Sequence, residues 1–277
     1  MISKGTRIFK IFHAQYFNIF VLNLFFMDFQ YEYLLLIPVG FIAGFLNTIA
    51  GGGTLLTLPV LIFMGLPAPL AQGTNRIAIL LQTFAAVRGF KSKDVSTYPF
   101  SLYVGIAAFF GALIGAYLAL DFDGKIFNRV LALIMLGVLL LTIFNSNKTN
   151  VNLTEKLTGK PLIIAIVIFF FLGIYGGLIN AGIGFLMLLV LPYVNGMSLL
   201  RANATKVFVA FVYTIAAVMV FAIENKINYT LAAILSIGNV SGAWFGSRWS
   251  VKKDDKIIKA FLIVTVTALA IKLWFFN

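Results

Sequence analysis

The chain has 277 residues, of which 61% are hydrophobic and 11% are charged, and its mean hydropathy is +1.01. Soluble domains average about 45–50% apolar and about 25% charged residues, so this composition excludes an ordinary soluble fold. Polar residues lie in short gaps between apolar runs of about 20 residues. Backbone groups in hydrocarbon must be paired within each segment, which leaves helices. The sequence predicts an all-α, polytopic transmembrane helical bundle.

The formal net charge is +12, and the lysines and arginines lie between the apolar segments. This placement indicates membrane orientation and not nucleic-acid binding. The chain has no cysteine, and His13 is its only histidine. Metal and cysteine or histidine catalytic sites need several such ligands, so we expect no catalytic residues, no metal and no cofactor.

Residues 1–29 are expected to form an N-terminal extension or an extra helix. The first transmembrane repeat is predicted at 30–145, with apolar segments at 33–50, 54–66, 74–90, 101–120 and 126–144. A polar linker follows at 146–160. The second transmembrane repeat is predicted at 161–277, with apolar segments at 161–181, 184–196, 203–224, 229–247 and 257–275.

The second five segments echo the first five. At a constant offset of 133, Gly40, Gly44, Asn47, Gly51 and Pro59 fall on Gly173, Gly177, Asn180, Gly184 and Pro192. At an offset of 131, Ala71, Thr74, Tyr98, Gly111 and Gly115 fall on Ala202, Thr205, Tyr229, Gly242 and Gly246. The chain is therefore interpreted as a tandem duplication, which is common among secondary transporters.

Lysines and arginines near helix ends favour inverted repeats. If the loop with Arg88, Lys91 and Lys93 is cytoplasmic, an odd number of crossings per half places the linker and the basic segment 248–259 on the same side. Parallel halves would divide the positive residues about evenly, which leaves no bias for insertion. The fold expected is a bundle of two homologous, inverted repeats with broken, glycine-rich helices.

The stretch from Gly40 to Arg76 is too long for one helix, and it contains Gly51, Gly52, Gly53 and Pro59. A break in the helix is expected there. Such a break is tolerated in lipid only where it faces protein or a water-filled cavity, and a helix that restarts at Thr54 would point its positive dipole end at an anion. The alternative is that the glycines only allow close helix packing. The break recurs near Gly182 and Gly184, and the substrate-binding residues predicted here are Asn47, Gly51, Gly52, Gly53, Thr54, Asn180, Gly182 and Gly184.

A polar cluster follows each break and heads an apolar helix. The predicted binding residues in these clusters are Gln72, Thr74, Asn75 and Arg76 in the first half, and Asn203, Thr205 and Lys206 in the second. Threonine and asparagine at these positions are also explained by helix capping. Capping does not explain Arg76 and Lys206, because a helix N-terminus disfavours cations. An anionic substrate would pair with them, while snorkelling to the membrane surface remains the alternative.

The run AGGGTLLTLPVLIFMGLPAPLAQGTNR and the pair GIYGGLINAGIGFLMLLVLPYVNG and LLRANATKV resemble the two half-motifs of the TauE/SafE family. The similarity spans about residues 30–275. It implies a multi-pass protein of a bacterial or archaeal inner membrane, whose family members are linked to sulfite, sulfoacetate and other small organic anions. The second motif has Phe185 and Leu186 where the first has Gly52 and Gly53.

We therefore expect a secondary transporter of small anions, with an anion channel or an intramembrane enzyme as alternatives. All nine acidic residues lie at predicted helix ends or loops, so no mid-membrane carboxylate is available as a proton relay. The partners expected are the lipid bilayer and a small anionic substrate, with no nucleic acid; a homo-oligomer is left open.

Overall fold

A computed structural model describes residues 31–121 and 154–252. The described residues up to Leu35, which form the short helix η1 (Tyr31–Leu35), belong to one unit, and those from Leu36 onward belong to a second. The expected N-terminal extension and the expected segments at 126–144 and 257–275 lie outside the described residues.

All the regular elements in the described part of the second unit are helices, which confirms the all-α prediction. Three of its helices, α5, α7 and α9, are long and apolar enough to cross a membrane. The elements in chain order are α2 (Leu36–Ile49), α3 (Thr54–Phe63), α4 (Ala68–Lys91), α5 (Phe100–Leu120), α7 (Lys160–Leu178), α8 (Ile183–Asn195), α9 (Leu199–Ile223) and α10 (Tyr229–Val251).

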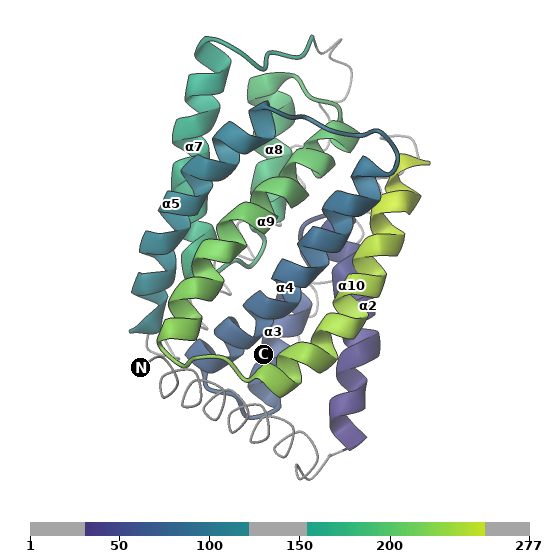
Figure 1. The fold of residues 1–277 in the computed structure, drawn as a ribbon, viewed down its shortest axis with the longest axis vertical. Helices are drawn as coiled ribbons and strands as arrows, with labels where there is room; N and C mark the ends of the chain where they lie inside the picture. Colours follow the sequence, from purple (N-terminus) through teal and green to yellow (C-terminus); the bar gives the residue numbers. More distant parts are fainter. Residues whose placement is uncertain (1–30, 122–153, 253–277) are drawn as a thin grey trace, which may run out of the picture. The chain divides into compact units, whose positions relative to one another are not determined.

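The six longer helices pack side by side in the order α7, α5, α9, α4, α10, α2 (Figure 1). Each of the two short helices packs beside its own half: α3 contacts α2 and α4, and α8 contacts α7 and α9. The predicted duplication makes α7 the counterpart of α2, α8 of α3, α9 of α4 and α10 of α5. When every helix is replaced by its counterpart, the same series of contacts results, read from the other end. Such an exchange is what the predicted duplication requires, so the arrangement supports that prediction.

Glycines set the contact between α5 and α7. A Cβ added to Gly173 or Gly177 would lie less than 3.0 Å from the carbonyl oxygen of Ala108 or Ala112, respectively. Gly111 on the facing helix is equally close to the backbone of α7. Small residues let the two backbones approach, and in lipid this close van der Waals packing holds helices together.

The pair α2 and α10 repeats this contact. Gly40 and Gly44 meet the carbonyl oxygens of Leu235 and Asn239 as Gly173 and Gly177 meet those of Ala108 and Ala112. The offset between α2 and α7 is the predicted 133. The offset between α5 and α10 is 127, because Ala108 and Ala112 correspond to Leu235 and Asn239 in these contacts. Gly111 therefore corresponds to Gly238, whereas the sequence predicted Gly242, one helical turn further along. The glycines recur at turn spacing, so sequence alone could not choose the register.

The predicted breaks in the helices are confirmed. Residues 50–53 separate α2 from α3, and residues 179–182 separate α7 from α8. The second break begins earlier than expected, and Gly184 is already helical. The two breaks meet: a Cβ on Gly51 or on Gly184 would overlap the backbone of the other residue.

Helices α4 and α9 run in opposite directions. Gly73, near the start of α4, lies against the backbone of Lys226, just beyond the end of α9. Thr205, near the start of α9, hydrogen-bonds Thr97 beyond the end of α4, with 2.7 Å between the hydroxyl oxygens. This antiparallel contact supports inverted repeats, which remain a prediction.

Surface cations gather at one end of these helices. Gly89 on α4 contacts Ser247 on α10, so both helices terminate at the end where α9 begins. All the described cations except Lys226 and the buried Arg76 and Lys206 lie there: Arg88, Lys91, Lys93, Lys156, Lys160, Arg201, Arg248 and Lys252. This asymmetry is the one expected for a cytoplasmic end.

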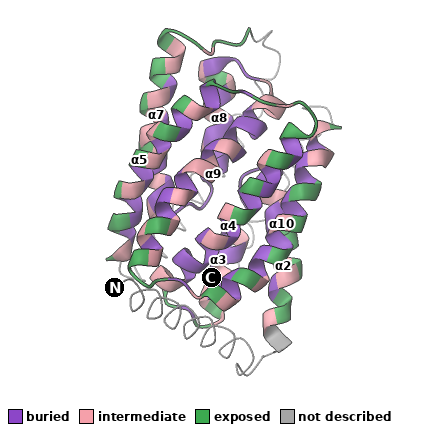
Figure 2. Ribbon diagram, viewed as in Figure 1, coloured by how far each residue is buried: buried purple, intermediate pink, exposed green. Residues whose placement is uncertain are grey.

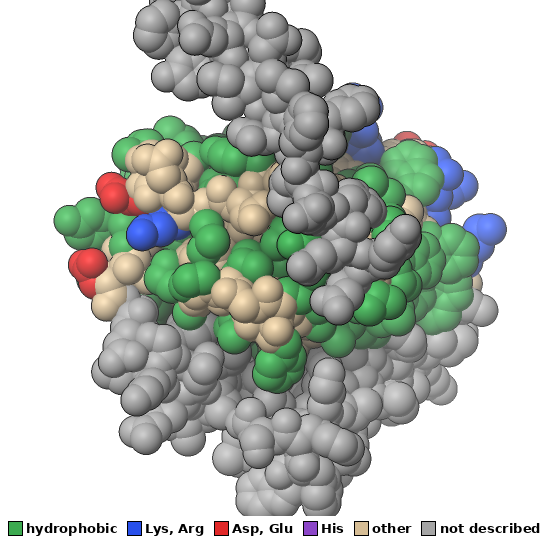
Figure 3. All heavy atoms as spheres, turned by 90° about the horizontal axis from the view of Figure 1, so that it is seen from below, with side chains coloured by type: hydrophobic (Ala, Val, Ile, Leu, Met, Phe, Trp, Pro, Cys, Tyr) green, Lys and Arg blue, Asp and Glu red, His purple; other side chains and the backbone are tan. Residues whose placement is uncertain are grey.

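The outward faces of the bundle are apolar. Exposed side chains include Phe110 on α5, Phe171 on α7 and Ile237 on α10, and buried positions line the faces between helices (Figure 2). Seen from below, along the long axis, hydrophobic side chains lie among other groups on the described surface, with a few charged groups toward the margin (Figure 3). The outward faces of the helices fit a lipid environment.

Replacing Gly51 by alanine should destabilise the fold strongly. Gly51 and Gly65 have nearly the same positive φ, 89° and 90°, but only Gly51 faces another backbone. Gly65→Ala should therefore cost about 1 kcal/mol, and Gly51→Ala about 1–3 kcal/mol more because of crowding. Unfolding temperatures of the purified protein in detergent measure the difference. Equal losses in the two variants would show that the breaks do not meet.

The chain has no native cysteine, so single cysteines can report sidedness. We expect Lys93→Cys to react with a membrane-impermeant maleimide only from the cytoplasmic side, and Lys226→Cys only from the opposite side. Labelling of intact cells and of inverted vesicles distinguishes these outcomes. Reaction of both cysteines from the same side would contradict the orientation.

Candidate functional site

A small cavity lies where the two breaks meet α4 and α9. Its lining residues are Asn47, Ile79, Gln82, Thr83, Asn180, Ile183, Gly184, Met187, Lys206, Val207, Ala210 and Tyr213. Its volume of about 20 Å³ suits roughly one water molecule, since a water needs about 10–15 Å³ measured in this way. This volume is smaller than any organic anion.

Lys206 reaches from α9 to the C-terminal end of α2. Its Nζ donates hydrogen bonds to the carbonyl oxygens of Asn47 (3.0 Å) and Thr48 (2.9 Å), and to Oδ1 of Asn203 (2.8 Å). The last carbonyls of a helix lack intrahelical partners and carry its negative dipole end. Lys206 therefore stabilises the end of the broken helix of the other half, and all three of its donors are used.

Arg76 holds a corresponding place on α4. Its Nη2 donates to the carbonyl oxygen of Gly177 in the last turn of α7, at 2.7 Å, and its guanidinium lies 6.0 Å from the centre of the Phe221 ring. Nη1 is buried without a hydrogen-bond partner. Arg76 is only 1% exposed, so neither it nor Lys206, at 3%, snorkels to the surface.

The two buried cations have no acidic partner within the described ranges. No aspartate or glutamate is buried there, and the ion pair between Arg201 and Glu155 (2.9 Å) lies at the solvent-exposed end. Helix dipoles stabilise the two charges only partly, and a buried charge without a counter-charge is costly. The interior is therefore electropositive and favours an anion.

Asn180 joins the two halves beside the cavity. Its Nδ2 donates to Oγ1 of Thr54 at 3.1 Å, and its Oδ1 accepts from the hydroxyl of Tyr213 at 2.6 Å. Asn180 has a φ of 63°, and the adjacent carbonyl of Ala181 accepts from the Tyr175 hydroxyl. These bonds hold the second break in a defined conformation.

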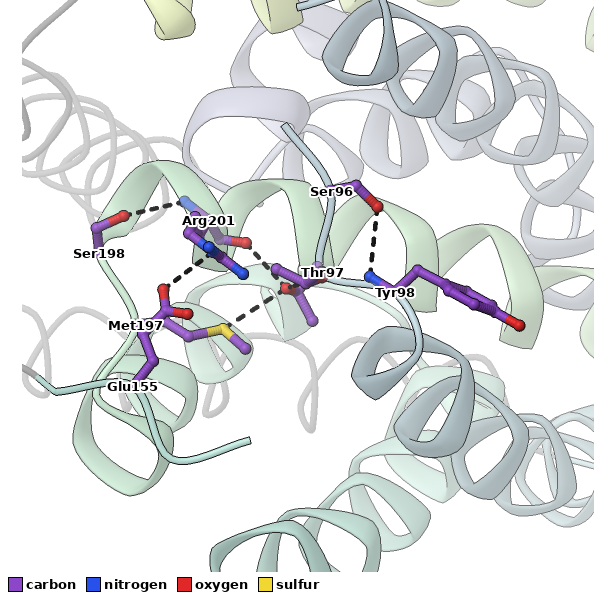
Figure 4. A network of polar contacts seen from close by, with 8 residues as sticks. Ser96, Thr97, Tyr98, Glu155, Met197, Ser198 and Arg201 are labelled. Carbon is purple, nitrogen blue, oxygen red and sulfur yellow. Dashed lines mark hydrogen bonds and ion pairs between the residues drawn. The ribbon is translucent and has the colours of Figure 1, made fainter. Parts of the chain in front are cut away.

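The predicted polar clusters lie inside their helices and do not cap them. Helix α4 begins at Ala68 after Pro67, and α9 begins after Ser198, whose hydroxyl accepts from the backbone N–H of Arg201 at 3.3 Å. Thr205 instead donates to the carbonyl of Arg201 or pairs with Thr97. Figure 4 shows Ser198 beside Arg201 in this network, with Thr97 close by. A proline in the first turn of α4 and the serine N-cap of α9 mark the true helix starts. The apolar pattern alone placed these starts later, at 74 and 203.

The structure brings together only some of the predicted site residues. Asn47, Asn180, Gly184 and Lys206 line the cavity, while Gly51, Thr54 and Asn203 contact these residues. Gly52 and Gly53 complete the first break, and Gly182 precedes α8 with a φ of 72°. The others, Gln72, Thr74, Asn75, Arg76 and Thr205, do not line it.

Gln82, Thr83 and Tyr213 line the cavity but were missed by the sequence analysis. They lie in the middle of long helices, where one polar residue among apolar ones gives little signal. A helical spacing of seven residues from Arg76 and Lys206 could have found Thr83 and Tyr213, because such residues lie on nearly the same face.

The fold and the site define a multi-pass helical membrane protein with two interrupted helices and an electropositive interior. The chain belongs to the sulfite exporter TauE/SafE family, whose model matches residues 36–273. The names of this family and of the relatives below describe transporters and not enzymes.

Three curated relatives carry the description of a probable membrane transporter protein. ORF9 of a Sinorhizobium species is 28% identical and covers 86% of this chain and 90% of its own. A protein of Haemophilus influenzae is 26% identical, with shares of 83% and 89%, and YfcA of Escherichia coli K12 is 24% identical, with shares of 85% and 87%. No solved structure matches the chain.

Lys206→Met should destabilise the protein, because it leaves the carbonyls of Asn47 and Thr48 without their partner. We expect the free energy of unfolding to fall by about 1–3 kcal/mol. Lys226→Met, at an exposed lysine, is the matched control and should change it by less than about 0.5 kcal/mol. Denaturation of the purified protein in anion-poor buffer measures both, and equal stability of the two variants would contradict the capping role of Lys206.

Proposed function

We propose that this protein is a secondary transporter of small anions in the bacterial inner membrane, with sulfite, sulfoacetate or related organosulfur and organic anions as substrates. The observation that carries the proposal is the pair of buried cations, Arg76 and Lys206, without a buried carboxylate in the described ranges. The family name and the names of the relatives support transport.

Two helix N-termini add to this electrostatic preference. Helices α3 and α8 begin at the breaks, after Gly53 and Gly182, and neither has a side chain bonded to its first N–H groups. The N–H groups of Leu55, Leu56 and Phe185 already donate to the carbonyls of Gly52, Gly53 and Gly182. These ends therefore favour an anion mainly through the helix dipole. An anion between the breaks would lie near both positive ends and near Lys206.

Transport requires the small cavity to widen toward each side in turn. The bonds that join the halves at the cavity are few: Asn180 to Thr54, and Lys206 to the end of α2. Helix α10 packs with α2 and α4, and α5 packs with α7 and α9. Rocking of the group α2, α3, α4 and α10 against the group α5, α7, α8 and α9 would exchange such bonds without unfolding a helix. The buried interior of the described residues offers no carboxylate to carry a coupling proton, so the membrane potential is a sufficient driving force for anion expulsion.

Neutralising either buried cation should slow anion flux. In vesicles reconstituted with the purified protein, Arg76→Gln and Lys206→Gln should lower the initial rate of sulfite or sulfoacetate efflux by about tenfold or more, as loss of about 1.5–3 kcal/mol of charge-assisted interaction implies. Arg88→Gln removes an exposed cation at the end of α4 and should leave the rate unchanged.

Flux through the wild-type protein no faster than through protein-free vesicles, for every anion tested, would overturn the proposed function. Ohmic, non-saturating currents would favour a channel over a transporter. Wild-type rates in both glutamine variants would remove Arg76 and Lys206 from the anion path.

A further inference from the structure

A chain of three hydrogen-bonded residues closes one side of the cavity. Tyr213 donates to Asn180, and Asn180 donates to Thr54, which joins α9 and the second break to the start of α3. Every polar atom that Asn180 offers to the cavity is thereby used within the protein.

The same three positions in the other half carry a different set of residues. At the offsets of 131 and 133, Tyr213, Asn180 and Thr54 correspond to Gln82, Asn47 and Met187. All of these last three line the cavity. The cavity thus lies between two equivalent walls, as the further pair Ile79 and Ala210, also at an offset of 131, indicates.

The wall of Gln82, Asn47 and Met187 lacks the hydrogen bonds that join Tyr213, Asn180 and Thr54 in the other wall. Gln82 is 1% exposed, and its Nε2 has no hydrogen-bond partner. The side-chain amide of Asn47 makes no hydrogen bond within the described ranges. Met187 stands where Thr54 would accept a hydrogen bond, and a thioether is a weak acceptor. The polar atoms that Tyr213, Asn180 and Thr54 satisfy among themselves are left free on this side.

The free amide of Gln82 needs an explanation, because a buried donor without a partner costs about 1–3 kcal/mol. An apolar side chain at position 82 would remove this cost, while the half-buried amide of Asn47 adds a second free donor beside it. A single water would satisfy part of it in the closed form. A ligand with several acceptor oxygens would satisfy it fully once the cavity widens.

We propose that the amides of Gln82 and Asn47 bind the transported anion directly, and that the wall formed by Tyr213, Asn180 and Thr54 does not. This inference rests on the proposed function and names the contacts within it. The ligand is an oxyanion, such as a sulfonate or sulfite, whose oxygens accept N–H bonds from the amides. Lys206 contributes charge, because its three donors are already bonded to protein.

The test is the concentration dependence of sulfoacetate and sulfite efflux from vesicles that contain the full chain. Gln82→Leu and Gln82→Met remove the amide at similar volume, and we expect either to raise KM about tenfold or more. Ser236→Ala removes a buried hydroxyl on α10 that does not line the cavity, and it should leave KM unchanged. Unfolding temperatures provide the second readout. Sulfoacetate should raise the unfolding temperature of the wild type and of Ser236→Ala, and should raise that of Gln82→Leu and Gln82→Met much less.

The unliganded unfolding temperature separates binding from structure. An unpartnered buried amide lowers the stability of the fold, so Gln82→Leu and Gln82→Met should be at least as stable as the wild type without anion. A wild-type KM in folded Gln82→Leu or Gln82→Met would overturn the inference while leaving the proposed function intact. If the wild-type protein itself moves neither anion, the proposed function fails and this inference fails with it.

Discussion

A helix that stops inside a bilayer leaves backbone carbonyls without partners, and every other feature of the interior follows from how these groups are satisfied. Here each broken helix ends against a cation from the other half: Lys206 binds the end of α2, and Arg76 binds the end of α7. The cations replace the missing hydrogen bonds, and they also bring positive charge into a space without a described carboxylate. The same contacts thus stabilise the breaks and attract an anion.

Close packing of small residues holds the breaks in place. Gly51 and Gly184 let the two interruptions touch, while glycines on α2 and α7 bring those helices against α10 and α5. The central helices α4 and α9 then supply side chains to the cavity from two directions. A cavity of water size, crossed by few hydrogen bonds between the group α2, α3, α4 and α10 and the group α5, α7, α8 and α9, is expected of an intermediate between two open forms.

Sequence analysis could predict the breaks and the two cations, because glycine clusters and charges in apolar runs violate the composition of a lipid-embedded helix. It misplaced the starts of α4 and α9, since Pro67 and Ser198 precede stretches too polar to extend the apolar pattern. It also shifted the register of α10 by one turn, because several glycines there recur every four residues. Gln82 could not be recognised, since its role depends on which buried atoms lack partners, and only packing reveals this.

The central claim is that an anion binds between the two breaks, beside Lys206 and Gln82. Crystals soaked in selenite, an analogue of sulfite with an anomalous scatterer, test it most directly. The account predicts a selenium peak inside the cavity, within hydrogen-bonding distance of the Gln82 amide, which is lost in Gln82→Leu crystals. A protein that transports selenite but shows its selenium peak only at the surface, or an unchanged peak in the variant, would contradict the account.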